Sequence, residues 1–349
     1  MRRGLTAFVL LSIAATAGVF FATSTPSSLP EALARASPAF LLTLLLAPPA
    51  DWVVSGLRLW LFARVLSPDV TYGACVRNCA VGAFMGAVTP SQTGGGIAQV
   101  YALAREGATV AQSLTMLFLT FLSTLVFYFA LSVALWAAAA GGAVPGVEAS
   151  SPFLLAVAAF GTLAGIGLAT LVHPAGARRT LSRAAGWLHR RHVRARFADR
   201  LGEVLDQCGV SIAAMGRGHW ARFLLSVGLS VLVFGNRYFA GYLSARALGL
   251  DPPLVQLLAT QAFLNVLLYF FPTPGASGGA EVTSAVLMAP LVPASLLAPF
   301  TLLWRTATTY LSVLVGGWLL ARYVRRASVE PGPGSSLRPP EPAPPTPLA

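Results

Sequence analysis

The sequence predicts an all-α polytopic membrane protein with six full spans and two oppositely oriented broken-helix hairpins, which together form an inverted repeat. Three observations predict this fold. Of the 349 residues, 56% are hydrophobic and only 10% are charged, whereas soluble domains carry about 25% charged residues. Several apolar runs exceed the ~18 residues that indicate a membrane helix. Two of these runs are interrupted by near-copies of one glycine-rich motif.

The apolar segments in chain order are 5–22, 38–66, 73–104, 108–140, 152–172, 219–247, 254–289 and 296–322. The first also resembles a signal peptide, but a whole membrane domain follows it, so we interpret it as an uncleaved span. Segments 73–104 and 254–289 contain the motifs. Their returning arms have 11 residues each, too short to cross a core of about 30 Å, which favours re-entrant hairpins over full crossings.

Charge indicates the orientation and the domain division. Arginines crowd the interval 173–218, which we expect to be a basic cytoplasmic loop, and basic residues flank the first and last spans. Both termini are therefore predicted to be cytoplasmic, in a plasma membrane of bacterial type. The membrane domain is 1–325, with repeat one at 5–140 and repeat two at 152–322. The proline-rich tail, 326–349, is predicted to be disordered.

An internal duplication is indicated by two pairs of matching stretches. The motifs "TPSQTGGG" at 89–96 and "TPGASGGA" at 273–280 lie 184 residues apart, and "ARVLSPD" at 63–69 matches "ARALGLD" at 245–251 with an offset of 182. Composition bias is the alternative explanation. Because the charge pattern orients the halves oppositely, the pattern is typical of a secondary transporter with a site near the midplane.

Each motif predicts a turn that ends one helix and begins another. Paired glycines allow positive φ and close approach of a ligand, and the new helix begins with N–H groups and a partial positive charge. We expect Thr93 and Ser277 to cap these helices. Two such helix N-termini that meet would form a binding site for a phosphate group. The alternative is that the glycines only let helices pack closely.

Ionisable residues inside apolar segments are costly and indicate functional sites. Asp51, Arg58, Arg237, Glu281 and Arg305 are such residues. Glu281 is the nearest plausible carboxylate for Arg305, and the pair would either lock the packing or leave the arginine to bind phosphate. Neutral hydrogen bonds, to ligand or between helices, are expected from Asn78, Gln99, Tyr101, Gln261 and Asn265. The candidate substrate-binding residues are Thr89, Pro90, Ser91, Thr93, Gly94, Gly95, Gln99, Tyr101, Thr273, Pro274, Gly275, Ser277, Gly278, Gly279, Glu281, Arg58, Arg237 and Arg305.

Other functional classes lack support in the sequence. The three cysteines form no CxxC pair, and we expect no metal site and no cofactor. The net charge of +12 is explained by topology, so nucleic acid is not an expected partner. There is no HExxH, GxSxG, P-loop or dinucleotide motif, and acid–base chemistry would fall to Asp51 and Glu281 alone. We therefore do not expect an enzyme.

The stretches "TPSQTGGGIAQVYALAREG" at 89–107, "PTPGASGGAE" at 272–281 and "LLWRTATTY" at 302–310 resemble the lysylphosphatidylglycerol synthase membrane-domain family, also described as flippase-like integral membrane proteins. The resemblance covers about 5–325. In many members an acidic residue follows the first paired glycines and an arginine comes soon after. Here Gly96 and Gln99 occupy those places, which resembles a variant branch with glutamine.

The resemblance implies a lipid translocator, and the predicted inverted repeat implies that it works by alternating access. Its cargo would be a lipid with an anionic phosphate headgroup, such as an aminoacyl-phosphatidylglycerol or a polyprenyl-phosphate-type lipid. The family's soluble aminoacyltransferase has no counterpart in this sequence, so synthase activity is not expected. The alternatives are a lipid-binding partner of a separately encoded lipid-modifying enzyme, an intramembrane lipid-modifying enzyme that uses Glu281 or Asp51, and a carrier of small solutes.

Overall fold

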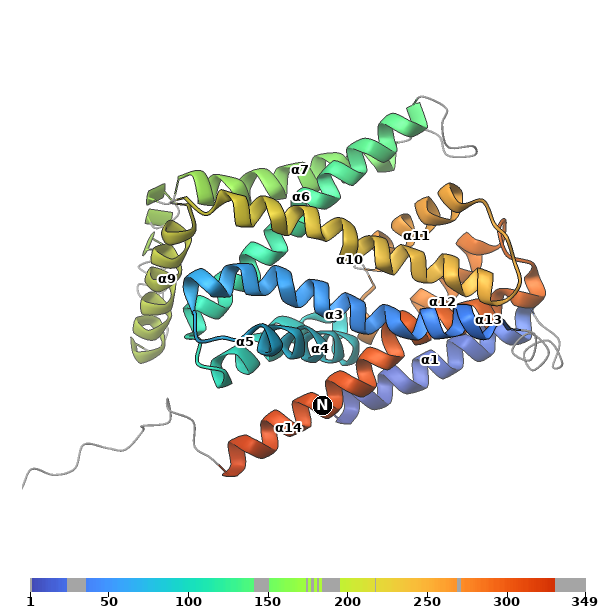
Figure 1. Cartoon of the computed structure of the whole chain (residues 1–349), viewed down its shortest axis with the longest axis horizontal. Coiled ribbons are helices and arrows are strands. Elements are labelled where there is room, and N and C mark those ends of the chain that lie inside the picture. The colour runs from blue at the N-terminus through green and yellow to red at the C-terminus, as the bar shows by residue number, and fades with distance from the viewer. Residues whose placement is uncertain are drawn as a thin grey trace, which may run out of the picture.

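The computed structural model describes residues 2–23, 36–140, 151–173, 175–176, 179–180, 182–183, 195–216, 218–268 and 271–329. Across these ranges all regular structure is helical (Figure 1). Residues 141–150, the central part of the predicted basic loop and the tail after residue 329 lie outside the described residues.

Apart from α9 (Ala195–Gly216), the helices follow the apolar segments predicted from the sequence. They are α1 (Arg2–Thr23), α3 (Pro38–Leu66), α4 (Tyr72–Val88), α5 (Gly94–Arg105), α6 (Val110–Ala140), α7 (Ser151–Val172), α9 (Ala195–Gly216), α10 (Trp220–Ala247), α11 (Leu254–Leu268), α12 (Gly279–Met288), α13 (Ala294–Arg305) and α14 (Leu311–Val329). The predicted helix breaks are confirmed as two 3₁₀ turns, η1 (Pro90–Gln92) and η2 (Pro274–Ala276).

Three of the described helices are long and apolar enough to cross a membrane. They are α3, the stretch Val110–Ala137 of α6, and α10. Shorter apolar helices lie at Phe8–Ala22, Val157–Val172 and Leu254–Leu268. An all-helical architecture of this composition is that of a membrane protein, while the number of crossings stays a prediction.

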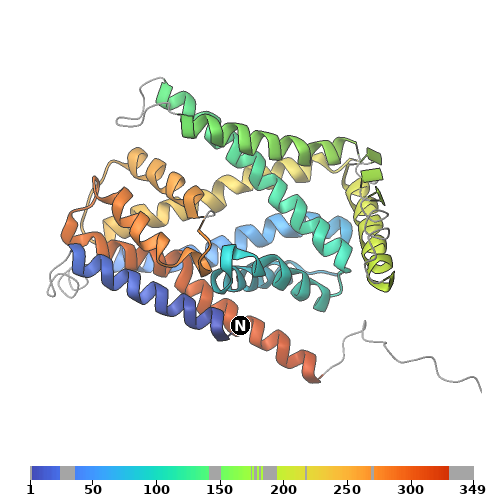
Figure 2. The same ribbon diagram turned by 180° about the vertical axis from the view of Figure 1, so that it is seen from behind.

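α10 and α3 run side by side through the middle of the bundle, with α6 and α7 on one side and α1 and α14 on the other (Figures 1 and 2). α3 packs along α10, which brings the two halves of the chain together. α4 packs on its hairpin partner α5 and on α14. α14 comes close to α4 because Gly316 has no side chain, and a Cβ there would lie 2.1 Å from the carbonyl oxygen of Ala80.

Two elements differ from the sequence prediction. The interval 173–218 is not only a polar loop, because its last part forms α9, which packs on α6 and α7. Its buried residues Cys208, Ile212 and Met215 have the helical spacing of an amphipathic face. In addition, the predicted span 296–322 contains a π-helical segment, η3 (Thr306–Tyr310), directly after Arg305. Such segments often mark functional sites.

Candidate functional site

The two motif turns have the same backbone conformation, 184 residues apart. In each turn two consecutive residues adopt the left-handed region, with φ between 48° and 58°: Ser91, Gln92, Gly275 and Ala276. In each, the amide of the fourth motif residue donates to the carbonyl of the first, at 3.2 Å in η1 and 3.1 Å in η2. Left-handed φ is uncommon outside glycine, and three of these four residues have a Cβ. The match of strained geometry supports a common origin of the two turns.

The two turns lie next to each other. η1 contacts η2, and η2 also contacts α4, the helix that leads into η1. Gly275 in η2 is needed at this contact, because a Cβ there would lie 2.9 Å from the carbonyl oxygen of Ala87. Two segments far apart in the sequence therefore meet within the helical bundle.

The start of α5 is capped by a residue other than the one predicted. The hydroxyl of Thr89 accepts a hydrogen bond from the N–H of Gly94 at 2.9 Å. Thr93 makes no side-chain cap and instead donates to the carbonyl of Pro90 at 3.0 Å. The prediction for Thr93 was wrong because the turn places the upstream threonine over the first amide of the helix.

The start of α12 also differs from the prediction. Its N-cap is Gly278, with φ 87°, so Ser277 lies one residue too early to cap. The carboxylate of Glu281 accepts from the N–H of Gly278 at 2.8 Å through Oε2. We expected the N–H groups at both helix starts to be free for a ligand. This prediction is wrong for the amides of Gly94 and Gly278, because each donates to a side chain of the protein.

Several motif glycines allow helices to pack closely. This was the alternative to ligand binding that the sequence analysis left open. A Cβ on Gly279 would lie 2.1 Å from the ring of Phe271, and one on Gly95 would lie 3.0 Å from the carbonyl oxygen of Gly82. The contact at Gly279 leaves no room for a side chain, and the one at Gly95 is tighter than an ordinary van der Waals contact. These two glycines are explained by helix packing rather than by the approach of a ligand.

The expected ion pair between Glu281 and Arg305 is present. Nε of Arg305 donates to Oε1 of Glu281 at 3.0 Å, and the two residues are 2% and 0% exposed. The guanidinium also donates to the hydroxyl of Thr309 at 3.1 Å and to the carbonyl of Gly275 at 3.2 Å. Arg305 thus joins η2, α12 and η3. Breaking a buried pair by removing one partner is strongly destabilising.

A second ion pair joins the two halves of the chain. Nε and Nη2 of Arg237 in α10 donate to the two carboxylate oxygens of Asp51 in α3, at 2.9 and 3.1 Å. The neighbouring Asn236 donates to the carbonyl of Ala47 at 2.8 Å. Sequence analysis named both charged residues but paired neither, because their contact depends on how α3 packs along α10.

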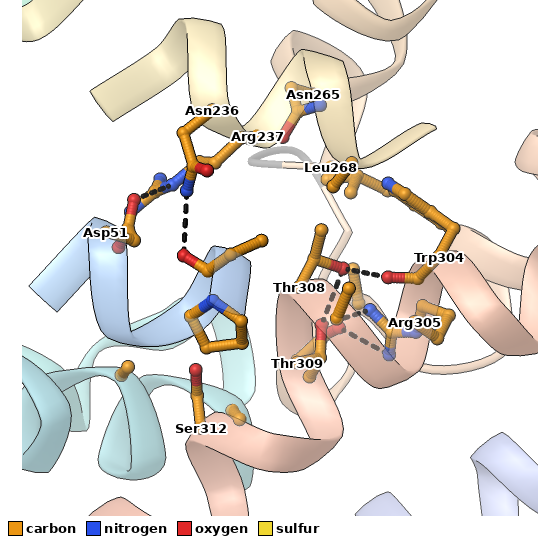
Figure 3. Close-up of a pocket in the computed structure, with 18 of the residues that line it drawn as sticks. Asp51, Asn236, Arg237, Asn265, Leu268, Trp304, Arg305, Thr308, Thr309 and Ser312 are labelled. Atoms are coloured by element: carbon orange, nitrogen blue, oxygen red, sulfur yellow. Dashed lines mark hydrogen bonds and ion pairs between the residues drawn. The ribbon is translucent and has the colours of Figure 1, made fainter. Parts of the chain in front are cut away.

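A cavity of about 180 Å³ lies among these groups (Figure 3). Both turns and the helices α3, α4, α10, α11, α13 and α14 contribute to its lining. On one side lie Asp51, Asn236 and Arg237, and on the other lie Trp304, Arg305, Thr308 and Thr309. Two guanidinium groups line it, and each is paired with a carboxylate, Arg237 with Asp51 and Arg305 with Glu281.

One buried donor of this cavity has no partner among the described residues. Trp304 is 1% exposed, and its indole Nε1 makes no hydrogen bond there. Thr308 donates its hydroxyl to the carbonyl of Trp304 at 2.8 Å, while Ser312 adds another hydroxyl to the lining. A buried donor without a partner is costly, and Trp304 is one of the residues that line the cavity.

A family model described as "Lysylphosphatidylglycerol synthase TM region" matches residues 7–316. The chain belongs to this family. The matched region contains every residue that lines the cavity, from Ala47 to Ser312. Family membership and the apolar helices together place the chain in a membrane and indicate a function related to membrane lipids. A search of curated proteins found no match to the chain.

Only some of the predicted binding residues line the cavity. Arg237, Gly275 and Arg305 line it. Arg58 lies elsewhere, buried between α3, α6 and α10, where it donates to the hydroxyls of Ser123 and Thr124 at 2.7 and 2.8 Å. The remaining predicted residues surround the turns without lining the cavity. Among them, the carbonyl of Gln99 accepts from Asn78 at 2.7 Å and Tyr101 is exposed.

Several cavity residues were missed by the sequence analysis. They are Gln92, Asn236, Trp304, Thr308, Thr309 and Ser312. A signal was present, because "RTATTY" at 305–310 places three threonines directly behind a buried arginine. The described residues contain no group of three or more side chains suited to hold a metal ion.

Proposed function

We propose that this chain translocates phospholipids with an anionic phosphate headgroup across the plasma membrane, with the headgroup passing through the central cavity. The observation that carries the proposal is a small cavity inside the helical bundle that two guanidinium groups and several hydroxyls line. Guanidinium groups suit phosphate oxygens, and the indole N–H of Trp304 offers a further donor. The likeness of η1 and η2 supports an inverted repeat and hence alternating access.

In this proposal the lipid phosphate competes with Asp51 and Glu281 for the guanidinium groups that these carboxylates now bind. Arg237 is bound to Asp51 and Arg305 to Glu281. A phosphate that enters would share these guanidiniums and accept from Trp304 and the nearby hydroxyls. Binding that only replaces existing bonds is weak, and weak binding suits a transporter because the cargo must also leave.

The proposal does not include an enzymatic step. Both carboxylate oxygens of Glu281 already accept hydrogen bonds, from Arg305 and from the amide of Gly278. Such a carboxylate is poorly placed to take a proton from a substrate. The partners we propose are membrane lipids, with both termini of the chain in the cytoplasm of a bacterial-type cell.

The cavity can be filled without touching either ion pair. Ala83 on α4 lines it and is exposed to it. Ala83→Leu should therefore block the passage of a headgroup. Ala104→Leu is the matched control, since Ala104 is exposed on the partner helix α5 and does not line the cavity.

The test uses purified protein in phosphatidylcholine vesicles with fluorescent phosphatidylglycerol, and chemical quenching of the outer leaflet. Ala83→Leu should slow flipping roughly tenfold, the effect of ~1.4 kcal/mol of overpacking, while Ala104→Leu should match the unsubstituted protein. Equal rates for both variants, or no flipping above that of empty vesicles, would reject the proposal. Saturable lipid binding without flipping would point instead to a lipid-binding partner of an enzyme.

A further inference from the structure

A second hollow lies outside the cavity, between α1 and the C-terminal helices α13 and α14. It has a volume of about 590 Å³. α1 contributes residues from Phe8 to Phe21, and the opposite wall includes Leu302, Val313 and Leu314. Figures 1 and 2 show α1 beside these helices. Apart from three hydroxyl-bearing residues, the lining of this groove is apolar.

The groove is joined to the cavity by a short chain of polar contacts. The hydroxyl of Ser12, in the groove, donates to the hydroxyl of Ser277 at 2.9 Å. Nη2 of Arg305, which lines the cavity, donates to the same Ser277 oxygen at 3.5 Å. The guanidinium of Arg305 also lies 5.6 Å from the ring centre of Tyr310, which lines the groove. These contacts link residues of the two hollows.

The length of the groove fits one acyl chain. Along α1, thirteen steps separate Phe8 from Phe21, which is about 20 Å at the rise of an α-helix. One leaflet of the membrane core is about 15 Å thick. A single acyl chain could therefore lie along α1 while its headgroup remains at the cavity.

We infer that this groove holds an acyl chain of the phospholipid whose phosphate enters the cavity. The inference rests on the proposed function, since it assigns the second part of the same substrate. The ester group of the lipid would lie at the groove wall beside Ser12. Ser277 is fully buried and links Ser12 to Arg305 rather than contacting the lipid. The substrate class is thus an acylated phospholipid rather than a free phosphate or a soluble phosphoester.

This groove differs from an ordinary lipid-facing surface. Leu224 and Leu225 on α10 are exposed apolar residues that line neither hollow. The groove, by contrast, is concave and ends at a buried polar contact beside the charged cavity. A lipid held there would be bound at both its polar and its apolar parts.

Two substitutions on α1 distinguish the groove from the rest of the helix. Ile13 and Leu10 are both 62% exposed, but only Ile13 lines the groove. Ile13→Trp should slow the flipping of fluorescent phosphatidylglycerol in vesicles roughly tenfold by filling the groove, and Leu10→Trp should leave the rate unchanged. Equal rates for the two variants would overturn the inference.

Photo-crosslinking separates this inference from translocation itself. The probe is phosphatidylglycerol with a diazirine at the end of one acyl chain, in phosphatidylcholine vesicles that contain the full chain. Adducts should appear in 13–21 of α1 and at Leu302, Val313 and Leu314. Unlabelled phosphatidylglycerol should compete with them, and diacylglycerol with the same acyl chains should not.

Each outcome bears on one claim. Groove adducts that phosphatidylglycerol does not displace, at the level of adducts on Leu224 and Leu225, would show bulk lipid only and overturn the inference, even if flipping is observed. Displaceable groove adducts without flipping would support the acyl-chain site while rejecting translocation.

Discussion

The first and second motif turns share a backbone but differ in how they are held. In the first, the residues from Pro90 to Thr93 are exposed, whereas in the second Pro274, Ala276 and Ser277 are buried. The position in the first repeat that corresponds to Glu281 is Ile97, which is 74% exposed. The motif therefore sets the shape of each turn through its own hydrogen bonds, while burial and charge pairing anchor only the second. We infer that the second turn is the fixed side of the site.

The largest expected effect tests this anchoring at the two corresponding positions. Glu281→Ala should lower the free energy of unfolding by about 3–5 kcal/mol, because it leaves the Arg305 charge buried without its carboxylate. Ile97→Ala should change it by less than about 0.5 kcal/mol, as exposed positions do. Denaturant unfolding in detergent measures both. The double variant Glu281→Ala/Arg305→Ala should recover part of the loss, and similar losses for the two single variants would refute the contrast.

A smaller effect concerns the glycines that follow each turn. Gly279→Ala should destabilise the chain by about 1–3 kcal/mol, because the new Cβ would meet the Phe271 ring. Gly96→Ala in the first motif has no atom within 4 Å of its new Cβ and should be neutral or stabilising by up to about 1 kcal/mol. Thermal unfolding midpoints compare the two variants. A loss at Gly96 as large as that at Gly279 would show that the close packing described here does not decide the effect.

The smallest effect is expected to be larger in the first turn than in the second, the opposite of the two effects above. Thr89 accepts from the amide of Gly94 and donates to the carbonyl of Met85, so Thr89→Val should cost about 1 kcal/mol. The corresponding Thr273 hydroxyl is buried and has no hydrogen-bond partner among the described residues. Thr273→Val should therefore be close to neutral. Faster hydrogen exchange at Gly94 in Thr89→Val would confirm the lost cap, and a larger loss at Thr273 would contradict the local bonding described here.

The sequence was sufficient to predict helices and breaks because apolar runs and Thr-Pro/Gly-Gly pairs act locally. It also predicted the Glu281–Arg305 pair, since a charge buried among apolar residues requires a partner. It could not pair Asp51 with Arg237, which depends on the packing of helices 186 residues apart. The threonines behind Arg305 are visible in the sequence, but no sequence pattern predicts the π-helical segment that carries Thr308 and Thr309. The caps at Thr93 and Ser277 were wrong because positive φ in the turns shifts which side chain reaches the first amide.

The indole of Trp304 offers the most direct test that a phosphate headgroup enters the cavity. In protein labelled with ¹⁵N-tryptophan, the Trp304 Nε1–H resonance can be assigned by its loss in Trp304→Phe. Titration with phosphatidylglycerol should shift this resonance downfield and saturate, and diacylglycerol with the same acyl chains should not move it. Trp318, exposed on α14, reports general contact with lipid. If the Trp304 resonance stays in place while that of Trp318 moves with both lipids, the cavity does not bind the headgroup.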